Sequence, residues 1–228
     1  MHYTMNYIAR LSLMATVILL ASTALNTPVS WCEDGPFKAG GVIKKDTTWS
    51  GEVVVESDVL VPEGVTLTIA PGSDVLFVPS ESTKIEPMFL SMQTELLVRG
   101  ALMAKGMKEN PITFGAAPAD VSGKKPERGD WGGIIFDGPS ASGSVVEYVR
   151  ITKADTGITT YYSSPVIKSV GVNDCKYGLA LMGASAPKLV GVSVTGCEYG
   201  LITSHGAKPE MSGCEISGNE QSNLVKDR

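Results

Sequence analysis

A phrase that returns after 22 residues is the feature that most constrains the fold of this chain: "CKYGL" begins at Cys175 and "CEYGL" at Cys197. The flanking residues repeat at the same interval and form columns when the segments are aligned. The columns are Pro165, Pro187 and Pro209; Ile167, Leu189 and Met211; Val170, Val192 and Cys214; Val172, Val194 and Ile216; and Cys175, Cys197 and Asn219. A fixed period between about 20 and 50 residues indicates stacked structural repeats.

The preceding segment joins the same array with a period of 21. Its matching residues are Val146, Val149, Ile151, Ala154, Gly157 and Ile158. Within each repeat, short apolar pairs alternate with period two between Gly, Pro, Asn and Asp, which predicts short strands joined by turns. We expect three strands per coil, with each coil pairing in parallel with the next, because a single coil could not bury its apolar face alone.

Several phrases elsewhere in the chain resemble the opening coils of right-handed parallel β-helix proteins of the pectin lyase-like superfamily, in its exported bacterial form. They are "GVTLTIAPGSDVLF" (64–77), "LLVRGALMAKG" (96–106), "NPITF" (110–114), "GDWGGIIF" (129–136) and "VEYVRITKADTGI" (146–158). The resemblance implies an all-β solenoid over residues 51–228, with coils of about 21–22 residues. It leaves the function open, because the superfamily includes lyases, hydrolases, adhesins and proteins with no known reaction.

The N-terminal segment has the pattern of a Sec-type signal peptide. Arg10 precedes an apolar stretch from Leu11 to Leu25, which is shorter than the ~20 residues that a membrane span needs. We expect a signal peptide over residues 1–30 and a cap segment over 31–50, with an uncleaved anchor as the alternative. The mature protein is then secreted or periplasmic and does not remain in the membrane. The net charge of -5 and the absence of a basic cluster argue against nucleic acid as a partner.

Two segments, 79–95 and 115–130, interrupt the repeat pattern. On a solenoid, insertions at turns often form the binding surface. The alternative is length variation without function, since surface loops lengthen at little cost in free energy.

Stacked columns also supply the candidate structural and ligand-binding residues. Cys175, Cys197 and Asn219 are predicted to stack at one turn, and we favour buried free thiols there over a disulfide, because parallel Cβ vectors hold the Cβ atoms too far apart. Cys214 is expected in the core, while the sequence leaves the oxidation state of all four cysteines, Cys32 included, undetermined. Tyr177 and Tyr199 form a second stack that is either a sugar-binding platform or packing at the turn.

Candidates for catalysis are few. The resemblance implies that a lyase would hold calcium between carboxylates and use a nearby Arg as base, and glycoside hydrolysis needs two carboxylates. The acids and the base that fit these roles best are Asp137, Glu147, Arg150 and Asp155. The repeat columns do not bring acids together into a calcium cluster, and no metal-binding spacing of His or Cys is present. We therefore predict no metal and no cofactor, with Ca²⁺ required only by a lyase.

These patterns favour an exported, non-catalytic β-helix module that binds carbohydrate or another cell-envelope component, or that serves as a structural solenoid. The alternative is a diverged polysaccharide lyase or glycoside hydrolase acting on an acidic polysaccharide. The last coil, near "CEISGNEQSNLVKDR" (214–228), lacks an evident cap, which predicts end-to-end self-association.

Overall fold

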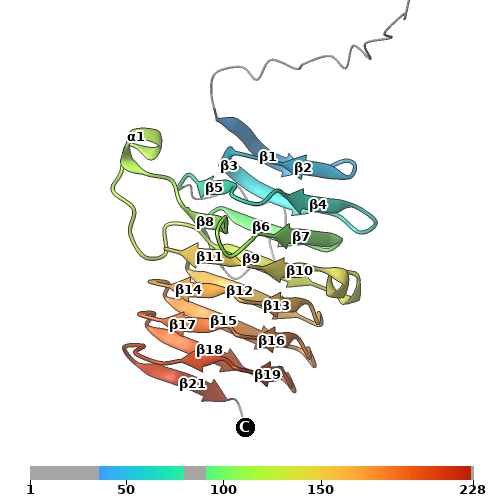
Figure 1. Cartoon of the computed structure of the whole chain (residues 1–228), viewed down its shortest axis with the longest axis vertical. Helices are drawn as coiled ribbons and strands as arrows, with labels where there is room; N and C mark the ends of the chain where they lie inside the picture. Colours follow the sequence, from blue (N-terminus) through green and yellow to red (C-terminus); the bar gives the residue numbers. More distant parts are fainter. Residues whose placement is uncertain (1–35, 80–90, 227–228) are drawn as a thin grey trace, which may run out of the picture. The chain divides into compact units, whose positions relative to one another are not determined.

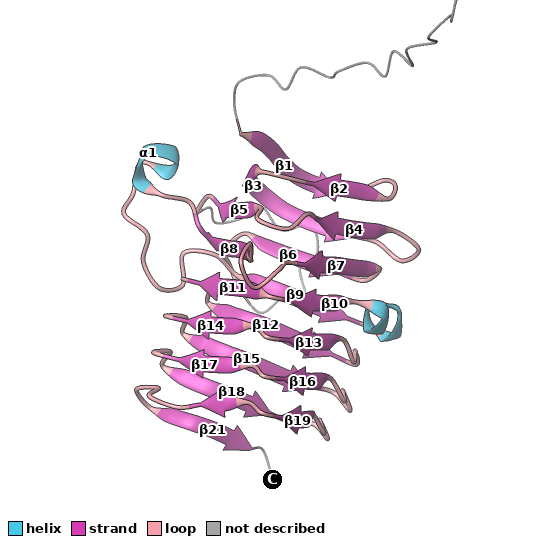
Figure 2. Ribbon diagram, in the orientation of Figure 1, coloured by secondary structure: helices cyan, strands magenta, loops and turns pink. Residues whose placement is uncertain are grey.

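The computed structural model describes residues 36–79 and 91–226 of the 228-residue chain. The predicted signal peptide, Cys32 and the centre of the first insertion lie outside these residues. Within them the chain winds into stacked coils whose strands pair in parallel (Figures 1 and 2). This confirms the stacked coils expected from the 22-residue period and the right-handed β-helix that the resemblance implies. Among the described residues, no helix has the length and apolar character to cross a bilayer.

Three ladders of parallel strands run along the stack, and we call them sheets 1, 2 and 3. Sheets 1 and 2 are joined by β3 (Glu52–Val61), whose first half pairs with β5 and whose second half pairs with β6. Sheet 1 continues through β5 (Asp74–Phe77), β8 (Ile112–Ala116), β11 (Val149–Thr152), β14 (Gly171–Asn173), β17 (Ser193–Thr195) and β20 (Glu215–Ile216). Sheet 2 continues through β6 (Glu95–Val98), β9 (Gly133–Asp137), β12 (Thr156–Tyr161), β15 (Tyr177–Met182), β18 (Tyr199–Thr203) and β21 (Ser222–Lys226).

Sheet 3 completes each coil. Its strands are β2 (Thr47–Trp49), β4 (Thr66–Ile69), β7 (Ala101–Lys105), β10 (Val145–Glu147), β13 (Val166–Lys168), β16 (Lys188–Val190) and β19 (Glu210–Ser212). One short α-helix, α1 (Ala119–Ser122), lies in the second insertion, and a 3-10 turn (Pro139–Gly143) precedes β10.

The first coil begins earlier than residue 51. Strand β2 already pairs with β4 in sheet 3, so Thr47–Trp49 belong to the solenoid rather than to a separate cap. Among the described residues, β1 (Phe37–Val42) alone lies ahead of this coil, and it pairs in parallel with β3. Phe37 contacts the ring of Trp49, with ring centroids 6.5 Å apart, and Trp49 is buried.

Strand register confirms the columns predicted from the repeat. Ile167 pairs with Leu189, Val172 with Val194, and Ile158 with Leu179. These side chains point inward and are fully buried, so the core is a stack of aliphatic layers. The register changes in the last coil, where Leu201 pairs with Leu224, 23 residues away.

Aromatic residues fill the interior of the earlier coils. Trp131 is fully buried and stacks on Phe77, with ring centroids 4.1 Å apart and planes 13° from parallel. Its indole Nε1 donates a hydrogen bond to the carbonyl oxygen of Thr152 at 2.8 Å. Trp131 therefore has a structural role as the anchor of the second insertion.

Candidate functional site

The candidate site lies at the corner where sheet 1 turns into sheet 2, in the coils from β11 onward. The same position in each coil adopts a left-handed backbone: Lys153 (φ 64°), Asp174 (φ 54°), Gly196 (φ 63°) and Gly218 (φ 63°). This conformation is strained for residues other than Gly, although Asp tolerates it better than most. Lys153 and Asp174 adopt it although neither is Gly.

A network of charged side chains surrounds this position, and we call it the charged corner: Arg128, Lys153, Asp155, Asp174, Lys176, Glu198 and Glu220. Lys153 Nζ donates to Asp174 Oδ2, and Lys176 Nζ donates to Asp155 Oδ1 at 2.9 Å. Burial alone would raise the pKa of Asp174, but hydrogen bonds from Lys153 and Arg128 outweigh it and lower that pKa below its usual value. The hydrogen bond to Asp155 raises the pKa of Lys176 above its usual value.

Arg128 fastens the second insertion across three coils. Its Nε donates to Asp174 Oδ1 at 3.2 Å, its Nη1 to Glu220 Oε1 at 2.9 Å, and its Nη2 to the carbonyl oxygen of Gly196 at 2.9 Å. The insertion thus leaves the stack after β8, passes through α1 and returns beside the later turns (Figure 1). The planar guanidinium suits this role, because it offers several donors in a fixed geometry.

The tripeptide "RGD" at 128–130 is held within the chain. Arg128 is engaged as described, and the side chain of Asp130 is only 8% exposed. Asp130 accepts hydrogen bonds from Lys124 Nζ at 2.8 Å and from the backbone N–H of Glu127 at 2.7 Å.

Tyr177 and Tyr199 lie beside the charged corner, at the starts of β15 and β18. Their ring centroids are 5.4 Å apart and their planes are 17° from parallel, and both residues are half-buried. Direct face-to-face contact would bring the centroids closer, so the rings are offset. Thr156 precedes and Ser222 follows them in the same column. The outer faces of the two rings are therefore not covered by another aromatic residue of that column.

A second aromatic pair, which the sequence did not predict, lies where the strands of sheet 2 end, opposite to the end that carries Tyr177 and Tyr199. Tyr161 and Tyr162 pack edge to face with centroids 4.6 Å apart, and they are 44% and 53% exposed. The signal in the sequence was the dipeptide "YY", in which Tyr161 ends β12 and Tyr162 follows it. Unlike Tyr177 and Tyr199, these two tyrosines are neighbours in the sequence and do not occupy equivalent positions of successive coils.

The stack of Cys175, Cys197 and Asn219 lies on the inner side of the same corner. Cys175 and Cys197 are free and fully buried, and each sulfur is directed to a backbone carbonyl two residues earlier. A hydrogen bond with Cys197, together with burial, raises the pKa of the Cys175 thiol. Asn219 accepts from the Cys197 backbone N–H at 3.0 Å and donates to the carbonyl oxygen of Val194 at 3.2 Å.

The four candidates for catalysis do not meet in one cleft. Asp137 ends β9 and pairs with Arg99 at 2.8 Å, while Glu147 lies on sheet 3 and pairs with Lys168 at 2.6 Å. Arg150 is exposed on sheet 1, and Asp155 belongs to the charged corner. Each acid is neutralised by its own cation on a different part of the solenoid. In the described parts of the chain, no three His, Cys, Asp or Glu side chains are grouped so that they could hold a metal ion.

Comparison with known proteins identifies the repeat itself. A family model described as "Right handed beta helix region" matches residues 109–226, which covers the coils from β8 to β21 and includes the charged corner. No curated protein and no solved structure matches the chain.

Proposed function

The chain belongs to the right-handed β-helix family, and on that premise we propose that it is an exported module that binds carbohydrate without catalysis. The observation that carries the proposal is the offset stack of Tyr177 and Tyr199 beside the charged corner. Aromatic rings on a rigid sheet bind the apolar faces of sugar rings, and they lose little side-chain entropy when they do so.

Polar groups next to the rings supply hydrogen bonds for sugar hydroxyls. Asp155, Lys176 and Glu198 directly precede the residues of the tyrosine column, and Thr156 and Ser222 flank the rings within it. The ion pair between Lys176 and Asp155 holds both side chains in place, which favours recognition because fewer rotamers are lost on binding. A ligand would therefore lie along the solenoid, with one sugar face on a tyrosine and its hydroxyls toward the ladder of charges.

A non-catalytic role is supported by the separation of Asp137, Glu147 and Asp155, since glycoside hydrolysis requires two carboxylates on either side of one bond. Export rests on the signal peptide pattern of residues 1–30.

The test is retention of the purified protein on a panel of neutral and acidic polysaccharides, with and without calcium, combined with assays for reducing ends and unsaturated uronates. We expect retention without products. Tyr177→Ala with Tyr199→Ala should weaken binding at least tenfold, a loss of about 1.4 kcal/mol or more. Tyr161→Ala, which removes an aromatic ring from the other edge of sheet 2, serves as the matched control.

The outcomes separate the alternatives. Product release above a heat-denatured control would contradict the proposal that the module does not catalyse a reaction. Unchanged retention of the variant that lacks both tyrosines would show that the polysaccharide binds at another site. Absence of retention on every polymer would contradict carbohydrate binding and favour the alternative of a structural solenoid.

A further inference from the structure

The cations of the charged corner already have acidic partners. Lys153 donates to Asp174, and Lys176 donates to Asp155 at 2.9 Å. Arg128 uses its Nε, Nη1 and Nη2 groups for acceptors in the later turns, as described above. An acidic sugar would therefore have to compete with a carboxylate or carbonyl oxygen of the protein for each of these cations.

Glu198 is the acid of the charged corner with the weakest contact to a cation. Its Oε1 lies 3.8 Å from Arg128 Nη1, which is beyond hydrogen-bonding distance, and its side chain is 38% exposed. Within the described part of the chain, no residue donates a hydrogen bond to this carboxylate. Its neighbours in the preceding and following coils, Lys176 and Gln221, are both described. Glu198 thus offers a negative charge that a ligand can neutralise.

This charge belongs to the same turn as the tyrosine stack. Glu198 precedes Tyr199 at the start of β18, as Lys176 precedes Tyr177 one coil earlier. Asp155 is the main cause of the raised pKa of Lys176, and Glu198 and Tyr177 add to it, so these groups lie near one amine. A sugar that packs on a tyrosine ring therefore presents its substituents to the charges of this corner.

The balance of charge favours a cationic ligand. The chain has a net charge of -5, and four acids face three cations in the charged corner. A polymer of uronic acids would add like charges here, which disfavours binding. A polymer of amino sugars brings the opposite charge and is attracted at long range.

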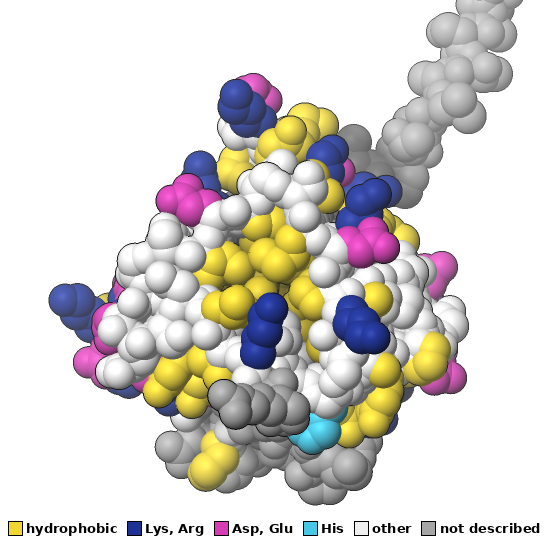
Figure 3. Space-filling model, turned by 90° about the horizontal axis from the view of Figure 1, so that it is seen from below, with side chains coloured by type: hydrophobic (Ala, Val, Ile, Leu, Met, Phe, Trp, Pro, Cys, Tyr) yellow, Lys and Arg dark blue, Asp and Glu magenta, His cyan; other side chains and the backbone are white. Residues whose placement is uncertain are grey.

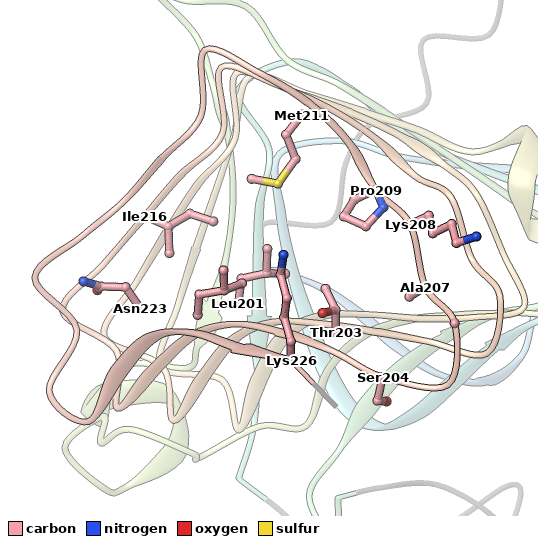
Figure 4. Close-up of a pocket in the computed structure, with 12 residues that line it drawn as sticks. Leu201, Thr203, Ser204, Ala207, Lys208, Pro209, Met211, Ile216, Asn223 and Lys226 are labelled. Atoms are coloured by element: carbon pink, nitrogen blue, oxygen red, sulfur yellow. The ribbon is translucent and has the colours of Figure 1, made fainter. Parts of the chain in front are cut away.

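The hollow at the last described coil is a different feature (Figures 3 and 4). It lies over the interior of the solenoid, and its apolar lining includes Leu201, Met211 and Ile216, whose columns form the core. Lys226, which pairs in register with Thr203, extends into it (Figure 4). No residue of the charged corner or of the tyrosine stack lines this hollow, so the sugar site on the outer corner does not depend on it.

We propose that the carbohydrate bound at Tyr177 and Tyr199 carries protonated amino groups, as a polymer of glucosamine does, and that Glu198 accepts a hydrogen bond from one of them. This inference rests on the carbohydrate binding proposed above and assigns a class of sugar to it. A hydrogen bond between an ammonium group and a carboxylate is stronger than one between neutral groups. Acetylation of the amine removes its charge, so Glu198 distinguishes an amino sugar from its N-acetylated form.

The probes are two oligosaccharides with the same backbone, the hexamer of glucosamine and the hexamer of N-acetylglucosamine, and binding is measured by calorimetry at a pH at which the amines are protonated. We expect the glucosamine hexamer to bind about fivefold more tightly, the effect of one partly exposed ion pair. Glu198→Gln should abolish this preference and leave the affinity for the N-acetylated hexamer unchanged, which also shows that the variant is folded. Glu210→Gln, an exposed acid on sheet 3, is the matched control and should change neither affinity.

The tyrosine variant separates this inference from the proposed function. Tyr177→Ala with Tyr199→Ala should weaken the binding of both hexamers. The inference is overturned if the wild-type protein binds the two hexamers equally, if it prefers the N-acetylated one, or if Glu198→Gln keeps the preference; carbohydrate binding itself stands in each of these cases. If neither hexamer binds, the inference is wrong, and the proposed function fails with it only when the panel of polysaccharides shows no retention either.

Discussion

Replacing Arg128 by Ala tests whether the second insertion is fastened to the later coils as the structure indicates. The substitution removes hydrogen bonds to Asp174, to Glu220 and to the carbonyl oxygen of Gly196. The two carboxylates are 44% and 54% exposed, so each ion pair contributes about 0.5 kcal/mol after screening. The bond to the carbonyl oxygen adds about 1 kcal/mol. We expect the free energy of unfolding to fall by about 2 kcal/mol.

Urea unfolding at equilibrium measures this change, and thermal unfolding should show a decrease in Tm of about 4–8 °C for a domain of this size. Because part of the effect is ionic, the difference from wild type should shrink in 1 M salt. Lys125→Ala is the matched control: Lys125 lies on the same insertion, is exposed and makes no ion pair with any residue that the structure describes. A loss below about 0.5 kcal/mol for the Arg128 variant would refute the fastening role.

Acid should weaken the same contact. The pKa of Asp174 is lowered in the folded protein, so its contribution to stability is present above its unfolded pKa of about 3.9 and disappears as the pH falls through the lower folded value. The wild-type protein should therefore lose stability below about pH 4 more steeply than the Arg128→Ala variant. Parallel pH profiles for the two proteins would contradict the assignment of Arg128 as a cause of the shift.

Three further predictions concern the core and the turns. Trp131→Ala should lower the free energy of unfolding by about 3–5 kcal/mol in urea, because the buried indole stacks on Phe77; a loss below 1 kcal/mol would count against that packing. Gly133→Ala should prevent or severely weaken folding, since its φ is 123° and a Cβ would overlap the carbonyl oxygen of Thr156, whereas Gly143→Ala, with open space around it, should be nearly neutral by the same measurement. In native protein treated with a thiol reagent, Cys214 should be modified before Cys175 and Cys197, which are fully buried; peptide mass mapping that finds Cys197 modified as fast as Cys214 would reject this order.

The repeat predicted the stacking of this protein well, and it did so for a geometric reason. In a parallel, in-register stack, residues one period apart must lie over one another, so the column of Ile167 and Leu189 or of Val172 and Val194 can be read from the sequence. The stacked pair of Tyr177 and Tyr199 follows from the same rule.

The contacts of residues that do not belong to the repeat were decided by the tertiary structure. Arg128 sits in an insertion with no repeat, and it contacts Asp174 and Glu220 at separations of 46 and 92 residues, which no local pattern encodes. Asp137 and Arg99 meet across 38 residues for the same reason.

The orientation of Lys226 is a case in which the 22-residue period predicts the wrong face of the strand. A strict period of 22 would align it with Ser204, but one additional residue after Asn219 shifts β21 into register with Thr203 instead. Because side chains alternate between the two faces of a strand, this shift of one residue turns Lys226 from the outside of the solenoid toward its interior. The sequence by itself determined the coils and their columns, since these follow from the period. Only the folded chain decided where its turns and insertions place their charges.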